Sequence, residues 1–133
     1  MKTVLQPAAW PRPRGYANGV CAQGRQVFVA GMIGWTAAGA FESDDLVDQV
    51  RQALINVRDV LAEAGATPEH MVRMTWYVVD RADYLARGRA IGAVYREVMG
   101  HYDVAMSAVE VSALMEERAK VEIEVTAVVP QAL

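Results

Sequence analysis

Apolar residues recur every three or four positions between residues 46 and 64. This spacing places them on one face of a helix and predicts an amphipathic helix with one buried side. Ser43 or Asp44 is expected to cap its start, because a short side-chain oxygen can accept hydrogen bonds from the first unpaired amides. Gly65 is expected to end it in a left-handed conformation. The apolar positions are Leu46, Val47, Val50, Ala53, Leu54, Val57, Val60 and Leu61.

A second run with helical spacing extends from Asp80 to Gly100 and predicts one further helix. Gly88 and Gly92 lie inside it, and each costs a helix about 1 kcal/mol relative to alanine. We therefore expect another backbone to pack closely at these two glycines. The apolar positions of this helix are Tyr84, Leu85, Ile91, Val94, Tyr95 and Val98.

Five segments have strand-like patterns. The stretches "GVCA" (19–22) and "QVFVAGMI" (26–33) flank the polar "QGR", which predicts a hairpin. The stretch "VRMTWYVVD" (72–80) is rich in β-branched and aromatic residues and has apolar side chains on both faces, as in a central strand. The last two, "AMSAVEVSAL" (105–114) and "AKVEIEVTAVV" (119–129), are expected to be strands of antiparallel type.

The order of these elements, β-β-α-β-α-β-β, predicts a single domain of the α+β class over residues 1–133. A mixed sheet with both helices on one face gives a two-layer sandwich. Residues 1–15 hold three of the five prolines and are expected to lie over its surface as an extended segment. The uncovered sheet face is expected to be apolar enough for subunits to associate through it.

The composition excludes several classes of function. The net charge is -3 and the 13 basic residues are scattered among 16 acidic ones, so no nucleic-acid partner is expected. With no apolar leader and no long apolar window, we expect a soluble cytoplasmic protein without a membrane partner. Cys21 is the only cysteine and is expected to be a small buried hydrophobe. His70 and His101 lack metal-ligand spacing and no phosphate-binding loop is present, so neither a metal nor another cofactor is expected.

Several stretches, taken in order, resemble the Rid family, also called YjgF-like or L-PSP proteins, over nearly the whole chain. They are "GYANGV", "VFVAGMIG", "QVRQALINVRDVLAEAGA", "VRMTWYVVD" and "SAVEVSALMEERAKVEIEVTAVV". The resemblance implies a chorismate-mutase-like fold and a homotrimer with small-molecule clefts at the subunit interfaces. Family enzymes hydrolyse reactive 2-imino acids to 2-keto acids and ammonia without metal or cofactor. In them an arginine binds the substrate carboxylate and a glutamate positions the attacking water.

The resemblance assigns roles to individual residues. Tyr16 matches a tyrosine that lines the cleft, Gly31 a glycine after the second strand's core, and Glu122 the water-positioning glutamate. Ala108 matches the position whose backbone amide faces the ligand. Met106 stands where the enzymes carry the arginine, since "VAMS" replaces their "PARS". Methionine has neither the charge nor the forked donors of a guanidinium, so small 2-imino acids are expected to be poor substrates. The chain thus resembles a Rid subgroup without this arginine.

Two features bear on how a ligand is held without that arginine. Met32 replaces a polar family residue, and with Met106 and Trp35 it could form an apolar, aromatic pocket for a larger or uncharged ligand. Packing at an interface explains these residues equally well. Arg12 or Arg14 could supply the missing guanidinium. The alternative is that both are solvated charges on a proline-rich arm.

The favoured hypothesis is a cofactor-free hydrolytic deaminase that acts on an enamine or imine other than the small 2-imino acids, with Glu122 orienting water. By spacing alone, Glu122 is also a solvent-facing strand residue. The alternative function is a trimer that binds a small, rather apolar metabolite without chemistry. The endoribonuclease or translation-inhibitor role attached to some relatives is disfavoured, because the acidic chain lacks a basic groove and paired histidines.

Overall fold

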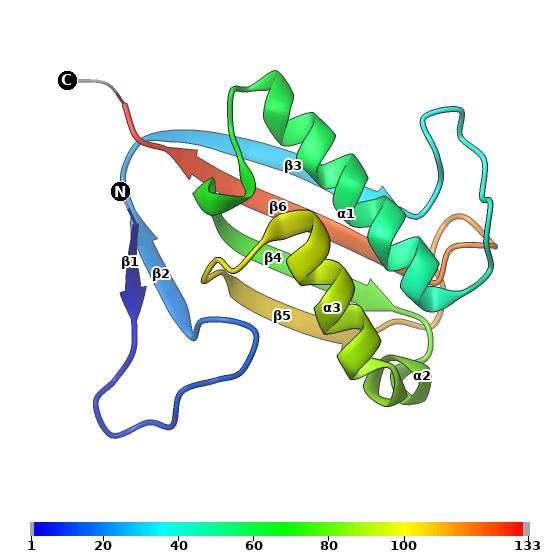
Figure 1. Cartoon of the computed structure of the whole chain (residues 1–133), viewed down its shortest axis with the longest axis horizontal. Coiled ribbons are helices and arrows are strands. Elements are labelled where there is room, and N and C mark those ends of the chain that lie inside the picture. Colours follow the sequence, from blue (N-terminus) through cyan, green and yellow to red (C-terminus); the bar gives the residue numbers. More distant parts are fainter. Residues whose placement is uncertain (1, 132–133) are drawn as a thin grey trace.

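The structure, a computed structural model, describes residues 2–131 and has two layers, a sheet with helices on one of its faces (Figure 1). Its strands form two sheets. One is a four-stranded mixed sheet in the order β3-β6-β4-β5, and the other is a small sheet of β1 and β2. The α+β sandwich is therefore confirmed. The strands are β1 (Lys2–Leu5), β2 (Gly19–Ala22), β3 (Arg25–Ile33), β4 (Met71–Val78), β5 (Ala105–Glu110) and β6 (Val121–Val129). The helices are α1 (Leu46–Glu63), α2 (Arg81–Ala86) and α3 (Gly88–Met99), with a 3₁₀ turn at Pro68–His70.

The core lies between the sheet and the helices α1 and α3. Every second side chain of β6 is buried there, from Val121 to Ala127, while the polar residues between them face the other way. On α1, Leu54 and Val57 are fully buried, and Gly65 follows the helix with a φ of 68°, as predicted. β4 lies between β6 and β5, which confirms its central position. Side chains return to the same face every two residues in a strand and every 3.6 residues in a helix, and this explains which side chains are buried in the core.

The predicted hairpin of residues 19–33 is wrong. β2 pairs with β1, so part of the segment 1–15 is a strand rather than an irregular arm. β3 pairs with the last strand, β6. The chain turns away at Gly24, where φ is 150° and a Cβ would collide with the carbonyl of Val129. Gly24 therefore packs against the end of β6, and this contact separates β2 from β3.

The last two strands do not pair with each other, contrary to the antiparallel expectation. β5 runs parallel to β4, because the crossover through α2 and α3 returns the chain to the same end of the sheet. The one helix predicted for 80–100 is two helices with a break at Arg87. The expectation of close backbone packing at the two glycines is also wrong, because a Cβ would meet nothing within 4 Å at Gly88 and only the side chain of Arg96 at Gly92.

The sheet face opposite the helices is mixed rather than apolar. Phe28 is 71% exposed on it. Its other side chains include Arg73, Tyr77, Glu122 and Glu124, which share this face by strand register. The expectation of an apolar face is therefore wrong, and association of subunits through it stays a prediction. The expectation of a buried cysteine is wrong as well, because the single cysteine is exposed on β2.

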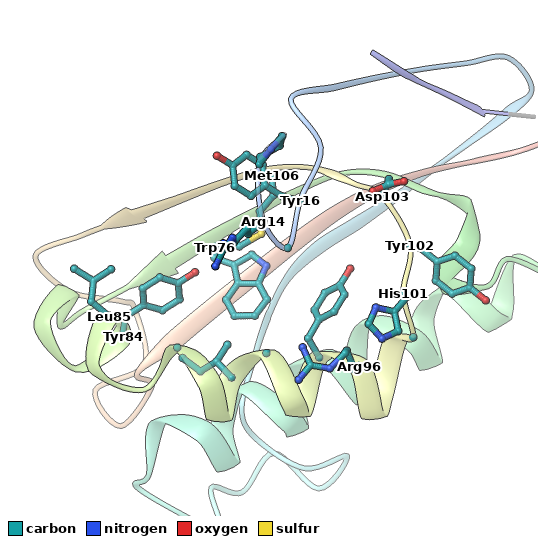
Figure 2. Close-up of a pocket in the computed structure, with 17 residues that line it drawn as sticks. Arg14, Tyr16, Trp76, Tyr84, Leu85, Arg96, His101, Tyr102, Asp103 and Met106 are labelled. Atoms are coloured by element: carbon teal, nitrogen blue, oxygen red, sulfur yellow. The ribbon is translucent and has the colours of Figure 1, made fainter. Parts of the chain in front are cut away.

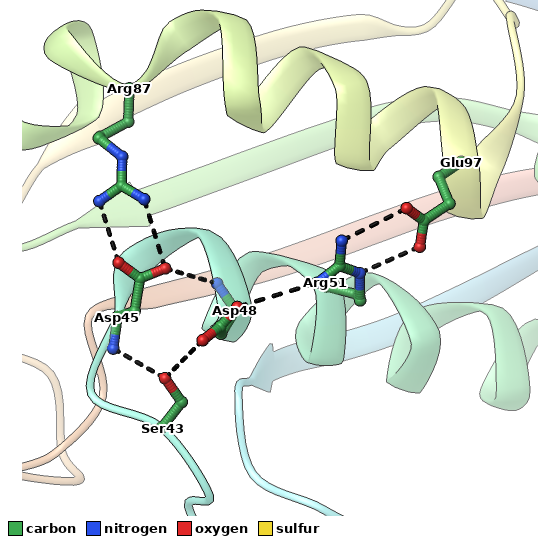
Figure 3. A network of polar contacts seen from close by, with 6 residues as sticks. All are labelled: Ser43, Asp45, Asp48, Arg51, Arg87 and Glu97. Carbon is green, nitrogen blue, oxygen red and sulfur yellow. Dashed lines mark hydrogen bonds and ion pairs between the residues drawn. The ribbon is translucent and has the colours of Figure 1, made fainter.

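A polar network holds the start of α1 against the second helical segment (Figure 3). Asp45, one residue beyond the predicted caps, is the N-cap, and its carboxylate accepts a hydrogen bond from the Asp48 amide at 3.1 Å. The same carboxylate pairs with Arg87 at 3.0 Å. One turn further along α1, Arg51 pairs with Glu97 of α3, also at 3.0 Å. The two helices are thus joined at both ends of α3.

We expect Asp45→Asn to lower the Tm by a few degrees at neutral pH and to leave it unchanged at about pH 2. The hydrogen bond from Arg87 is the main cause that holds the pKa of Asp45 below its usual value. Such a carboxylate stabilises the fold above its unfolded-state pKa, and this contribution is lost as the pH falls through the folded-state pKa. The effect is small because asparagine keeps the cap and the ion pair is exposed to solvent.

Thermal melts across this pH range test the prediction, with Asp59→Asn on the exposed side of α1 as the control. A Tm difference that is the same at every pH would contradict it.

Candidate functional site

A cavity of about 500 Å³ lies between residues 13–16 and helix α3, above β4 and the start of β5 (Figure 2). The N-terminal segment is fixed there because the amide of Ala17 donates to the carbonyl of Val104 at 2.9 Å. This contact places Tyr16 beside the start of β5, where Met106 lies. The cavity thus brings together two residues that lie 90 positions apart in the sequence.

One wall of the cavity is aromatic. The ring of Trp76 lies 6.2 Å from that of Tyr84, edge-on, and 6.5 Å from that of Tyr95. Burial raises the pKa of both tyrosines, that of Tyr95 to about 12, so their hydroxyls are neutral hydrogen-bond donors at physiological pH. The sequence predicts Tyr84 and Tyr95 as apolar positions of a helix and Trp76 as a residue of a central strand. The missed signal was Gly88 and Gly92, which interrupt the apolar stripe on the face that carries both tyrosines.

The mouth of the cavity carries charged groups. Arg14 and Arg96 line it, together with His101 and Asp103. Two arginines against one aspartate give this region a local excess of positive charge, in a chain whose net charge is -3. Arg12 is not among the lining residues. Of the two arginines considered from the sequence, the structure therefore places Arg14 at the cavity.

A second group of predicted residues lies on the opposite face of the sheet. Gly31 sits at a bulge of β3, and a Cβ on it would collide with the carboxylate of Glu122. The neighbouring Glu124 accepts a hydrogen bond from the Tyr77 hydroxyl at 2.6 Å, which is the main cause that raises the pKa of Tyr77. Glu122 is half-buried and, among residues 2–131, makes no hydrogen bond or ion pair. It is thus the carboxylate of this face that is open to a ligand.

The predicted site residues therefore fall into separate places. Met106 points to the helix side of the sheet, in register with the buried Met74, and Ala108 follows on the same side at an exposed position. Met32 packs against the core two strands away, and Trp35 packs against Phe41 at 6.0 Å, so neither lines the cavity.

Within one chain, the structure joins Tyr16, Arg14 and Met106, and separately joins Gly31 and Glu122. The sheet lies between the two groups. A single cleft that contains both must therefore be formed by two chains.

Two negative findings apply to residues 2–131. No three His, Cys, Asp or Glu side chains gather closely enough to hold a metal ion. In the same part of the chain, no helix has the length and apolar character needed to cross a membrane.

The chain is thus a small α+β protein with a mixed four-stranded sheet and two separate groups of candidate site residues, one on each face of that sheet. The family described as Endoribonuclease L-PSP matches residues 8–129. A crystal structure of the conserved Rid family protein YyfB from Yersinia pestis is 34% identical, covers 96% of this chain and 98% of that chain, and has a TM-score of 0.85.

Curated relatives agree with this class. A RutC family protein of Pyrococcus horikoshii is 32% identical over 96% of this chain and 98% of its own length. A protein of Capra hircus named 2-iminobutanoate/2-iminopropanoate deaminase is 26% identical over 96% of this chain and 90% of its own length. The chain belongs to the Rid family of YjgF-like, or L-PSP, proteins.

Proposed function

We propose that this protein is a hydrolytic deaminase of an enamine or imine and that Glu122 positions the attacking water. The observation that carries the proposal is the Glu122 carboxylate, which lies over Gly31 without a partner among the described residues. Only a glycine at position 31 leaves room for it. A half-buried carboxylate with unused acceptor atoms can hold a water and accept its proton. Kinship with a named deaminase supports the same chemistry.

The reaction needs no oxidant or reductant. Water attacks the imine carbon, a C–O bond forms, and the π electrons of the C=N bond move to nitrogen. Glu122 accepts one proton from the water and passes it to the nitrogen, which gives a carbinolamine. The proton of its hydroxyl group is then transferred to the nitrogen, and the C=O bond forms as the C–N bond breaks and ammonia leaves. One imine and one water thus give one carbonyl compound and one ammonia.

We infer that the working site lies between subunits of a homotrimer. Glu122 and Gly31 come from the open face of one chain, and Tyr16, Arg14 and Met106 come from the cavity of its neighbour. The opposite placement of the two groups supports this arrangement, because one chain cannot bring them together. A cytoplasmic location remains part of the proposal.

The arrangement at Met106 disfavours small 2-imino acids as substrates and supports a subgroup without the carboxylate-binding arginine. The thioether supplies no charge, and Arg14 is exposed on a proline-rich segment. The same observation favours the second candidate function, a trimer that binds a metabolite without turnover.

The first test compares wild type with Met106→Arg on 2-iminopropanoate generated in situ by an amino-acid oxidase. We expect keto-acid formation at the spontaneous rate with wild type and at least about tenfold faster with the variant, because a guanidinium restores the carboxylate anchor. Met115→Arg is the matched control, since it adds the same charge at a residue that is 97% exposed.

Two outcomes would contradict the proposal. Rapid turnover by wild type would show that small 2-imino acids are substrates. Keto-acid formation at the spontaneous rate with both wild type and Met106→Arg would favour binding without chemistry.

A further inference from the structure

The cavity contains a buried polar atom without a partner in the part of the chain that the structure describes. Trp76 is 1% exposed, and its indole N–H has no hydrogen-bond acceptor. In Figure 2 the ring stands in the cavity with its nitrogen edge turned toward the Met106 end. Folded proteins nearly always pair a buried donor, because an unpaired one costs free energy. The indole N–H is therefore a donor that the acceptor atom of a bound ligand would satisfy.

The size and the walls of the cavity limit what that ligand can be. A volume of about 500 Å³ is typical of sites for small organic molecules and exceeds what a three-carbon acid fills. Tyr84 and Tyr95 flank the indole, and Ile91 and Met106 add apolar surface. Stacked and edge-on ring contacts suit a planar aromatic body. The thioether of Met106 is flexible and can move aside to admit it.

The space in the cavity depends on two glycines of α3. A Cβ on Gly88 would meet nothing within 4 Å, and one on Gly92 would meet only the Arg96 guanidinium, at 3.4 Å. Any larger side chain at these positions would project into the cavity. Each glycine also makes the helix less stable than alanine would, so the open cavity lowers the stability of α3.

We propose that this cavity binds an aromatic carboxylate, with a carboxylate oxygen on the indole N–H of Trp76 and the ring against the aromatic and apolar wall of the cavity. The local excess of positive charge from Arg14 and Arg96 favours an anion. That this ligand is also the substrate rests on the proposed function, whereas its binding does not.

The test is calorimetric titration of the full chain with phenylpyruvate, the stable keto acid that hydrolysis of an aromatic 2-imino acid would yield, and with pyruvate. We expect phenylpyruvate to bind at least about tenfold more tightly than pyruvate. Trp76→Phe keeps the ring but removes the N–H, and should weaken phenylpyruvate binding by about tenfold or more. Gly92→Leu fills the cavity while improving the helix, and should weaken it at least as much.

Trp35→Phe, outside the cavity, should bind like wild type. Circular dichroism melts confirm that each variant is folded.

Several results would overturn the proposal. They are no binding of phenylpyruvate by wild type, no preference over pyruvate, or an affinity unchanged in Gly92→Leu. An affinity that falls in Gly92→Leu but not in Trp76→Phe would overturn the assignment of the indole N–H. Binding with the expected variant effects, but without hydrolysis of any imine, would contradict the proposed function and leave this site intact. Imine hydrolysis without phenylpyruvate binding would contradict this site and leave the proposed function intact.

Discussion

Glu122→Gln is expected to lower kcat for imine hydrolysis by about 10²- to 10⁴-fold while leaving ligand affinity within a few-fold of wild type. Glutamine keeps the shape of the side chain over Gly31 but cannot accept the proton of the attacking water. The measurement is steady-state release of ammonia from the imine that proves to be turned over. The chemical step alone should be affected, because Glu122 acts on water rather than on the substrate carboxylate.

Glu124→Gln is the matched control, since it makes the same change two residues along the same face. Glu124 already accepts the hydrogen bond of Tyr77, and a glutamine oxygen can do the same. Its activity should stay close to that of wild type. If Glu122→Gln keeps its turnover, or if both variants lose it equally, the assigned role of Glu122 is wrong.

Gln49→Leu is expected to lower the free energy of unfolding by about 3 kcal/mol. Gln49 is 1% exposed, and its amide donates to the carbonyls of Ser43 and Arg118, both at 3.0 Å. Its carbonyl accepts from the amide of Lys120 at 2.7 Å. Leucine would leave these three backbone groups without their partner at the junction of α1 and β6. The measurement is urea denaturation followed by circular dichroism.

Gln52→Leu is the control on the same helix. Among residues 2–131 its side chain bonds only to Asn56, one turn away, so this change should cost a few tenths of a kcal/mol. A loss for Gln49→Leu that does not exceed that of Gln52→Leu would contradict the role of Gln49 as a bridge between segments.

Local pattern predicted the layers of this fold better than their connections. The alternation in β6 and the spacing in α1 identified which side chains are buried, because both periods follow from backbone geometry alone. The partner of β2 is instead β1, a segment about 17 residues earlier in the chain that the local pattern did not mark as a strand. Gln49 shows the same limit, since its three partners lie in loops that its own helix does not determine.

The candidate site was also predicted only in part. The family motifs located Tyr16, Gly31, Met106 and Glu122, but a motif does not state which face of the sheet a strand residue occupies. Parallel pairing of β5 with β4 places Met106 on the helix side, and the register of β6 places Glu122 on the other. Trp76 was predicted as a strand residue, and its unpaired indole N–H depends on what surrounds it in three dimensions.

The two groups of candidate site residues lie on opposite faces of one sheet, and this placement bears on how such proteins diverge in evolution. Under the proposed roles, a change at Met106 or Tyr16 would leave Gly31 and Glu122 of the same chain undisturbed, so ligand preference and water activation would drift under separate selection. After a gene duplication, two copies that differ only in the cavity would still co-assemble. The resulting mixed assembly would contain clefts that differ in ligand preference but share the same reaction.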